Sequence, residues 1–162
     1  MPFYYSAASQ QNTNASANTD TLLGDLKTAS ANAGLRAYVQ KLIAGTYATP
    51  ADNQVRLRLQ RFSSVGTYAS GTSITPSPLV PDAPAAASLA STLPTIGTAT
   101  LVAIPMVQLG FNQRGTAMWA AFNADEAVGV SGANNAANGI LVLDSQSTGA
   151  SVPVTYEMVF SE

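Results

Sequence analysis

Residues 54–62 read Gln-Val-Arg-Leu-Arg-Leu-Gln-Arg-Phe, and this stretch decides the fold class. Apolar side chains at positions 55, 57 and 59 alternate with polar side chains at positions 56, 58 and 60. Successive side chains of a β-strand point to opposite faces, so this period of two predicts a strand with one buried face. Burial of the three apolar side chains contributes roughly 1.5–3 kcal/mol each. Arg58, on the opposite face, is expected to lie in solvent and to contribute little beyond the packing of its stem.

A second alternating stretch lies at residues 151–161. It places five apolar side chains on one face, at Val152, Val154, Tyr156, Met158 and Phe160. Two prolines, at positions 105 and 153, mark strand edges or bulges because proline has no N–H to donate to a sheet.

Five further segments are candidate strands: Gly34–Ile43, Thr98–Gln108, Gly115–Phe122, Glu126–Val130 and Asn138–Leu143. The spacing in the first also fits a helix, but its short length and flanking glycines favour a strand. About seven short strands separated by turn-rich loops predict an all-β protein, an antiparallel β-sandwich of jelly-roll-like form. The connection after residue 129 ends in Asn138-Gly139, which suits a hairpin turn.

Residues 63–97 are rich in Ser, Thr, Gly, Pro and Ala. Because proline fixes φ and removes a hydrogen-bond donor, we expect a long loop here and no central strand. A loop of this length in a compact domain usually has a function or a partner.

Residues 1–33 differ in composition from the rest. Three aromatic residues, Phe3, Tyr4 and Tyr5, precede a polar tract at residues 9–19 that cannot bury enough apolar surface to fold alone. The segment is either a flexible leader or an extended N-terminal arm whose three aromatics bind another subunit. Asp20–Lys27 could add one helical turn capped by Asp20. We therefore divide the chain into an arm, residues 1–33, and a β-sandwich domain, residues 34–162.

The charge of the chain excludes several classes of partner. Seven basic and nine acidic residues among 162 give a net charge of −2 without any basic cluster. Binding to nucleic acid or to an anionic membrane surface depends on such clusters, so neither partner is expected. The first residues lack the basic and apolar regions of a signal peptide, which predicts synthesis in a cytoplasm.

The sequence offers little for catalysis. It contains no cysteine and no histidine, which excludes disulfides, thiolate or imidazole metal sites, and catalysis by either residue. The adjacent carboxylates Asp125 and Glu126 would point to opposite faces of a strand and suit a solvated turn better. Trp119 could stack on a sugar, although a tryptophan among alternating apolar residues is usually core. Arg114 suits an inter-strand or inter-subunit hydrogen bond. We expect no enzyme activity, no cofactor and no metal.

Three motifs stand out: the run at residues 49–61, the Gly-, Thr- and Pro-rich segment at 71–87, and Phe111-Asn112-Gln113-Arg114-Gly115-Thr116 leading to Trp119. These motifs resemble those of small head-associated virion structural proteins of tailed bacteriophages. Asn138-Gly139-Ile140 follows downstream, and the resemblance covers roughly residues 34–162. It implies a capsid-associated β-sandwich, often trimeric, with no catalytic residues to transfer.

The resemblance and the composition together suggest a capsid decoration or cement protein. Its partner would be the major capsid protein, its place the capsid surface of the virion, and its form a homo-oligomer, with a trimer favoured. The alternative is a receptor- or glycan-binding β-domain of a phage tail or fibre. Several exposed aromatics on one face would favour that alternative, and the sequence offers mainly Trp119.

Overall fold

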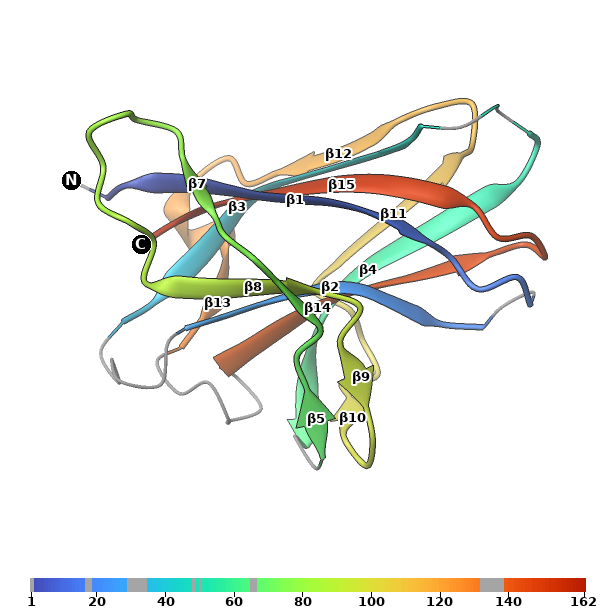
Figure 1. The fold of residues 1–162 in the computed structure, drawn as a ribbon, viewed down its shortest axis with the longest axis horizontal. Coiled ribbons are helices and arrows are strands. Elements are labelled where there is room, and N and C mark those ends of the chain that lie inside the picture. The colour runs from blue at the N-terminus through green and yellow to red at the C-terminus, as the bar shows by residue number, and fades with distance from the viewer. Residues whose placement is uncertain are drawn as a thin grey trace.

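The chain folds into two antiparallel sheets that pack face to face, so the predicted all-β sandwich is confirmed (Figure 1). The structure is a computed structural model that describes residues 2–16, 19–28, 35–47, 49, 51–64, 67–131 and 139–162. Outside the strands, the described chain includes a 3-10 helix, η1 (Ala124–Glu126), whose exposed carboxylates agree with the predicted turn.

The first sheet has six strands. Their order is β12 (Ala117–Ala120), β3 (Ala37–Thr46), β15 (Pro153–Ser161), β1 (Tyr4–Asn12) and β7 (Ser77–Pro78), with β13 (Val128–Val130) also on β3. Pro153 is the first residue of β15, where a proline costs the sheet little.

The second sheet has seven strands. Their order is β10 (Thr100–Leu101), β4 (Gln54–Ser64), β14 (Ile140–Ser147), β2 (Thr21–Thr28), β8 (Ser88–Thr92) and β6 (Thr72–Ile74), with β11 (Val107–Asn112) also on β4. Two short strands, β5 (Tyr68–Ala69) and β9 (Thr95–Ile96), form a separate pair. The predicted strand Thr98–Gln108 is thus divided between β10 and β11, and the predicted turn at Asn138 lies outside the described residues.

The main core lies between the two sheets. The predicted apolar faces of β4 and β15 both point into it: Val55, Leu57 and Leu59 are buried, as are Val152, just before β15, and the four alternating apolar residues within β15. The period of two therefore predicted the register of both strands correctly.

We expect Leu57→Ala to lower the free energy of unfolding by about 2–5 kcal/mol, because the side chain is fully buried and its removal leaves a cavity. Denaturant unfolding followed by fluorescence measures this loss. Ser64→Ala, an exposed position on the same strand, is the matched control and should change stability by less than about 0.5 kcal/mol. Equal losses in the two variants would contradict the register of β4.

A second, smaller core lies on the outer face of the second sheet. It consists of Phe62, Ala99, Ile140 and Val142, with Tyr68 and Leu101 packed against it. The run Ile140-Leu141-Val142-Leu143 is apolar without alternation, and β14 is accordingly buried on both faces. The outer face of β4 is therefore not simply a solvated surface.

The N-terminal segment is part of the sandwich, so its interpretation as an extended arm is wrong. β1 pairs with β15 along its whole length, from Tyr4 opposite Ser161 to Asn12 opposite Pro153. β2 lies between β14 and β8 in the second sheet. Backbone pairing and a few inward side chains hold β1, and neither is evident in its largely polar, low-complexity composition.

Residues 21–28 form β2, and not the helical turn predicted for Asp20–Lys27. Gly24 suits this position because a Cβ there would lie 2.0 Å from the Tyr156 hydroxyl oxygen, whose hydroxyl donates to the Leu23 carbonyl at 3.1 Å. The absence of a side chain lets β2 approach β15 of the opposite sheet.

The segment 63–97 also differs from the expected long loop. It contributes five complete short strands, and one of them, β8, is a central strand between β2 and β6. Its prolines lie at strand ends or between strands, where no ladder hydrogen bond is lost.

Candidate functional site

Four exposed apolar side chains surround the start of the described chain. Tyr4 begins β1, and Leu79 follows β7 and donates its N–H to the Tyr4 carbonyl at 2.9 Å. This bond continues the β1–β7 register, in which Tyr5 lies opposite Pro78. Phe3 directly precedes Tyr4, and Val80 directly follows Leu79. The two segments lie side by side in Figure 1. We call Phe3, Tyr4, Leu79 and Val80 the N-terminal apolar patch; by strand alternation Tyr4 and Leu79 share one face of the sheet, and Phe3 and Val80 lie on the other face at the same end.

All four side chains of the patch are exposed although they are large and apolar. Phe3 and Tyr4 each keep 40% of their surface accessible, Leu79 keeps 53% and Val80 keeps 48%. Adjacent exposed apolar residues of this size mark interaction surfaces more often than isolated ones do. Leu79 and Val80 were not predicted as site residues; the only sequence signal is an apolar pair inside a proline-rich segment.

Tyr5, the third aromatic predicted to bind a partner, is instead part of the core. It is 2% exposed, its ring stacks on Phe160 with 5.7 Å between centroids, and its hydroxyl donates to the Pro84 carbonyl at 3.0 Å. Burial raises the pKa of Tyr5. Because side chains alternate along a strand, Tyr4 and Tyr5 must point to opposite faces of the sheet, and only one can face a partner.

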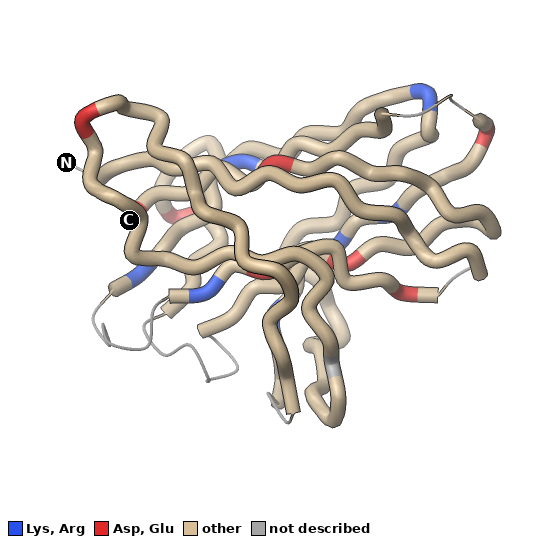
Figure 2. Tube along the Cα trace, viewed as in Figure 1, with Lys and Arg blue, Asp and Glu red and all other residues tan. Residues whose placement is uncertain are grey.

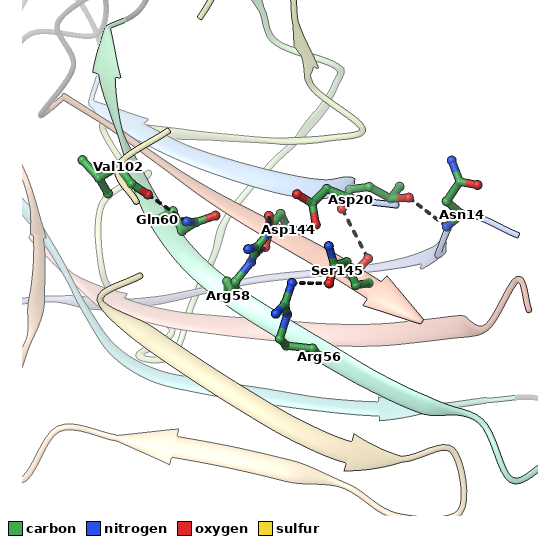
Figure 3. A network of polar contacts seen from close by, with 10 residues as sticks. Asn14, Asp20, Arg56, Arg58, Gln60, Val102, Asp144 and Ser145 are labelled. Carbon is green, nitrogen blue, oxygen red and sulfur yellow. Dashed lines mark hydrogen bonds and ion pairs between the residues drawn. The ribbon is translucent and has the colours of Figure 1, made fainter. Parts of the chain in front are cut away.

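Charged residues are few and spread over the molecule (Figure 2). The main exception is a polar network on the outer face of the second sheet (Figure 3). There Arg58 of β4 forms a bidentate pair with Asp144 of β14, with 2.8 Å between Nε and Oδ1. The same guanidinium pairs with Asp20, at 2.7 Å between Nη2 and Oδ1. Three segments far apart in sequence are thus joined by one side chain.

Asp144 is a wholly buried carboxylate, with a side chain that is 0% exposed. Burial raises the pKa of the Asp144 carboxyl, and the hydrogen bond and charge of Arg58 act in the opposite direction. The hydrogen bond to Asp144 raises the pKa of Arg58. Arg58 therefore stays charged and compensates the buried carboxylate, which makes the pair a structural cross-link.

A groove of about 470 Å³ adjoins this network. Arg56, Gln108, Asn112 and Gln146 line it, and Gly110 leaves it open because no atom lies within 4 Å of where its Cβ would be. The Arg56 guanidinium donates to the Gln146 side chain. Amide and guanidinium groups of this kind can bind polar ligands, but the groove has no exposed aromatic ring to stack on a sugar.

A second buried carboxylate, Asp25 of β2, holds the β5–β9 pair against the second sheet. Ser91 donates to Asp25 at 2.5 Å, and the Tyr68 hydroxyl donates to its other oxygen. Burial raises the pKa of Tyr68, and the charge of Asp25 adds to the effect. These contacts are structural because both donors are hydroxyls fixed by neighbouring strands.

Other residues singled out in the sequence take modest roles. Trp119 is partly buried and packs against the main core, as expected. Arg114 pairs with Asp52 at 2.7 Å on the surface, and both side chains are largely exposed. Among the described residues, no group of three or more acidic residues is placed to hold a metal ion. The described part also contains no helix long and apolar enough to span a membrane.

Comparison with known proteins gives no family. No family model and no curated protein matches the chain. Solved structures that it is similar to include infectious bursal disease virus Gx strain (10% identity, TM-score 0.17) and the VP2 subviral particle of that virus (10% identity, TM-score 0.13). Each match covers 99% of this chain and 42% or 41% of the other, so the chain spans about two-fifths of those proteins. TM-scores this low carry no argument about fold or function.

Proposed function

We propose that this chain is a non-enzymatic virion structural protein, a decoration or cement protein that binds the assembled major-capsid shell. The observation that supports this proposal most directly is the N-terminal apolar patch. Phe3, Tyr4, Leu79 and Val80 are held by paired strands, so they can be buried against a partner with little further ordering of the backbone.

The chemistry of the patch suits a protein partner. Aromatic residues dominate the energy of protein interfaces because they combine a large apolar area with few rotatable bonds. A low overall charge, −2 over 162 residues, leaves a surface that is easily dehydrated on contact. The absence of a basic cluster argues against nucleic acid as the partner.

The resemblance of residues 34–162 to head-associated phage proteins supports a virion context. It leads us to propose the capsid surface as the location, the major capsid protein as the partner and a host cytoplasm as the place of synthesis. Trp119 packs against the core, so the structure gives no specific support to a glycan-binding tail or fibre domain.

We expect the double variant Tyr4→Ala, Leu79→Ser to stay folded and to bind particles at least about tenfold more weakly, because both side chains lie in the patch. Sedimentation of the purified variant with virions stripped of the native protein measures binding. Tyr47→Ala is the matched control. Tyr47 is an exposed tyrosine that directly follows β3, at the end of the first sheet opposite to the patch.

Full binding by the double variant would contradict the role of the patch. The copy number in virions is a separate test of location. A number comparable to that of the major capsid protein supports decoration of the shell, whereas a few copies would place the chain in a tail or fibre instead.

A further inference from the structure

Half of β1 has a free edge. One edge of this strand pairs with β15 along all nine residues, whereas β7 covers only Tyr5 and Ser6 on the other edge. No strand in the described part of the chain pairs with the second edge between Ala8 and Asn12. The strand lies at the front of Figure 1, and its alternate side chains at positions 8, 10 and 12 are exposed.

The direction of the backbone groups along this edge follows from the hydrogen bonds. Phe3 and Glu162 exchange two backbone bonds, and the Thr13 N–H donates to the Val152 carbonyl at 2.9 Å. In an antiparallel ladder the groups of alternate residues point the same way, so odd-numbered residues of β1 face β15. The N–H and C=O groups of Ala8, Gln10 and Asn12 therefore point out of the sheet.

This edge lacks the features by which proteins prevent unwanted pairing. Residues 8–12 read Ala-Ser-Gln-Gln-Asn, with no charge and no proline, and the β1–β15 register contains no bulge. Other sheet edges are better protected. β12 is only four residues long, and β11 is preceded by Pro105 and contains Gly110.

We propose that the free edge of β1 binds the same edge of a second copy of this chain, antiparallel and centred on Gln10. Gln10 would then lie opposite Gln10 of the second copy, and Ala8 opposite Asn12. All three opposed pairs join residues whose backbone groups point outward, so each pair can exchange two hydrogen bonds. The paired window is limited at one end by β7, which pairs with Tyr5 and Ser6, and at the other end by the bend at residues 15 and 16.

The side chains at this contact favour a second copy as the occupant. The paired stretch is uncharged, so bringing two copies together creates no like-charge repulsion, and facing glutamine amides can hydrogen-bond across the axis. The contact would join the first sheets of two copies into one continuous sheet. Its symmetry is two-fold, because antiparallel pairing of identical edges is isologous, and a trimer cannot be built from this contact.

The test is the oligomeric state of the full chain, measured by light scattering after size exclusion and by native mass spectrometry over a concentration series. We expect a monomer–dimer equilibrium. Gln10→Pro removes an N–H that points away from β15, so the fold should survive, and the dissociation constant should rise about 10- to 100-fold. Gln10→Ala keeps the backbone groups and is the control.

A charge exchange keeps the test decisive if the proline variant does not fold. Gln10→Lys alone and Gln10→Glu alone each place two like charges opposite each other and should weaken the dimer about fivefold. A mixture of the two variants should form a mixed dimer in preference to either homodimer. A wild-type monomer at every concentration, a trimer, or a dimer indifferent to all of these changes would overturn the proposal.

Discussion

Deletion of residues 2–19 is expected to abolish folding of the remaining chain. The deleted segment contains all of β1, which lies between β15 and β7 in the first sheet. Its loss would leave one edge of β15, the edge that pairs with β1, without a partner. It would also remove the buried side chains of Tyr5 and Ala7 from the core. Loss of one large buried aromatic side chain alone costs about 3–5 kcal/mol, which is a large fraction of the stability of a typical domain.

Circular dichroism and a thermal or denaturant scan measure this effect. The truncated chain should show no cooperative transition, and a synthetic peptide of residues 2–16 added in excess should restore one by pairing with β15. A truncated chain that unfolds at the same midpoint as the full chain would support the opposite view, in which residues 1–33 are an arm outside the domain.

Arg58→Ala is expected to lower the free energy of unfolding by about 3–5 kcal/mol. The reason is the carboxylate that it leaves behind: Asp144 is fully buried, and Arg58 is its bidentate partner. This expectation reverses the one from sequence, in which Arg58 faced solvent and contributed little. Denaturant unfolding of the variant measures the loss.

Arg114→Ala is the matched control because Arg114 also pairs with an aspartate, Asp52, but with side chains that are 58% and 80% exposed. An exposed pair contributes about 0–1 kcal/mol. The double variant Arg58→Met, Asp144→Leu should recover much of the loss, since it removes the buried charge together with its partner. If Arg58→Ala and Arg114→Ala have equally small effects, the Arg58–Asp144 pair does not have the role assigned here.

The sequence predicts the fold class because two strands carry a clear period of two. β4 and β15 each have one apolar face, and packing of two sheets against each other buries the apolar faces of both strands. The same signal places Trp119 against the core. These positions are determined by the side chains of the strands themselves.

β1 and β2 could not be predicted in this way because partners distant in sequence determine them. Positions 9–12 of β1 are polar, yet the backbone pairs fully with β15, which a composition rule cannot detect. The role of Arg58 was hidden for a related reason. Asp144 and Asp20, the partners of Arg58, are both distant from it in sequence, and nothing near Arg58 indicates that pairing.

The candidate site was predicted in part. Phe3 and Tyr4 are exposed, and their binding to a partner stays a prediction, whereas Tyr5 is buried. Alternation along a strand would have separated Tyr4 from Tyr5 if the segment had been recognised as a strand.

The pairing of β1 with β15 also affects how the protein can be made. Tyr4 lies opposite Ser161, so a ribosome adding 5–20 residues per second needs roughly 10–30 s between synthesis of the two partners. During that time β1 has neither its neighbour nor a core to bury Tyr5. The first sheet therefore completes only after β15 has left the ribosome, and premature termination anywhere before β15 yields a chain with an exposed strand, open to aggregation or to chaperones.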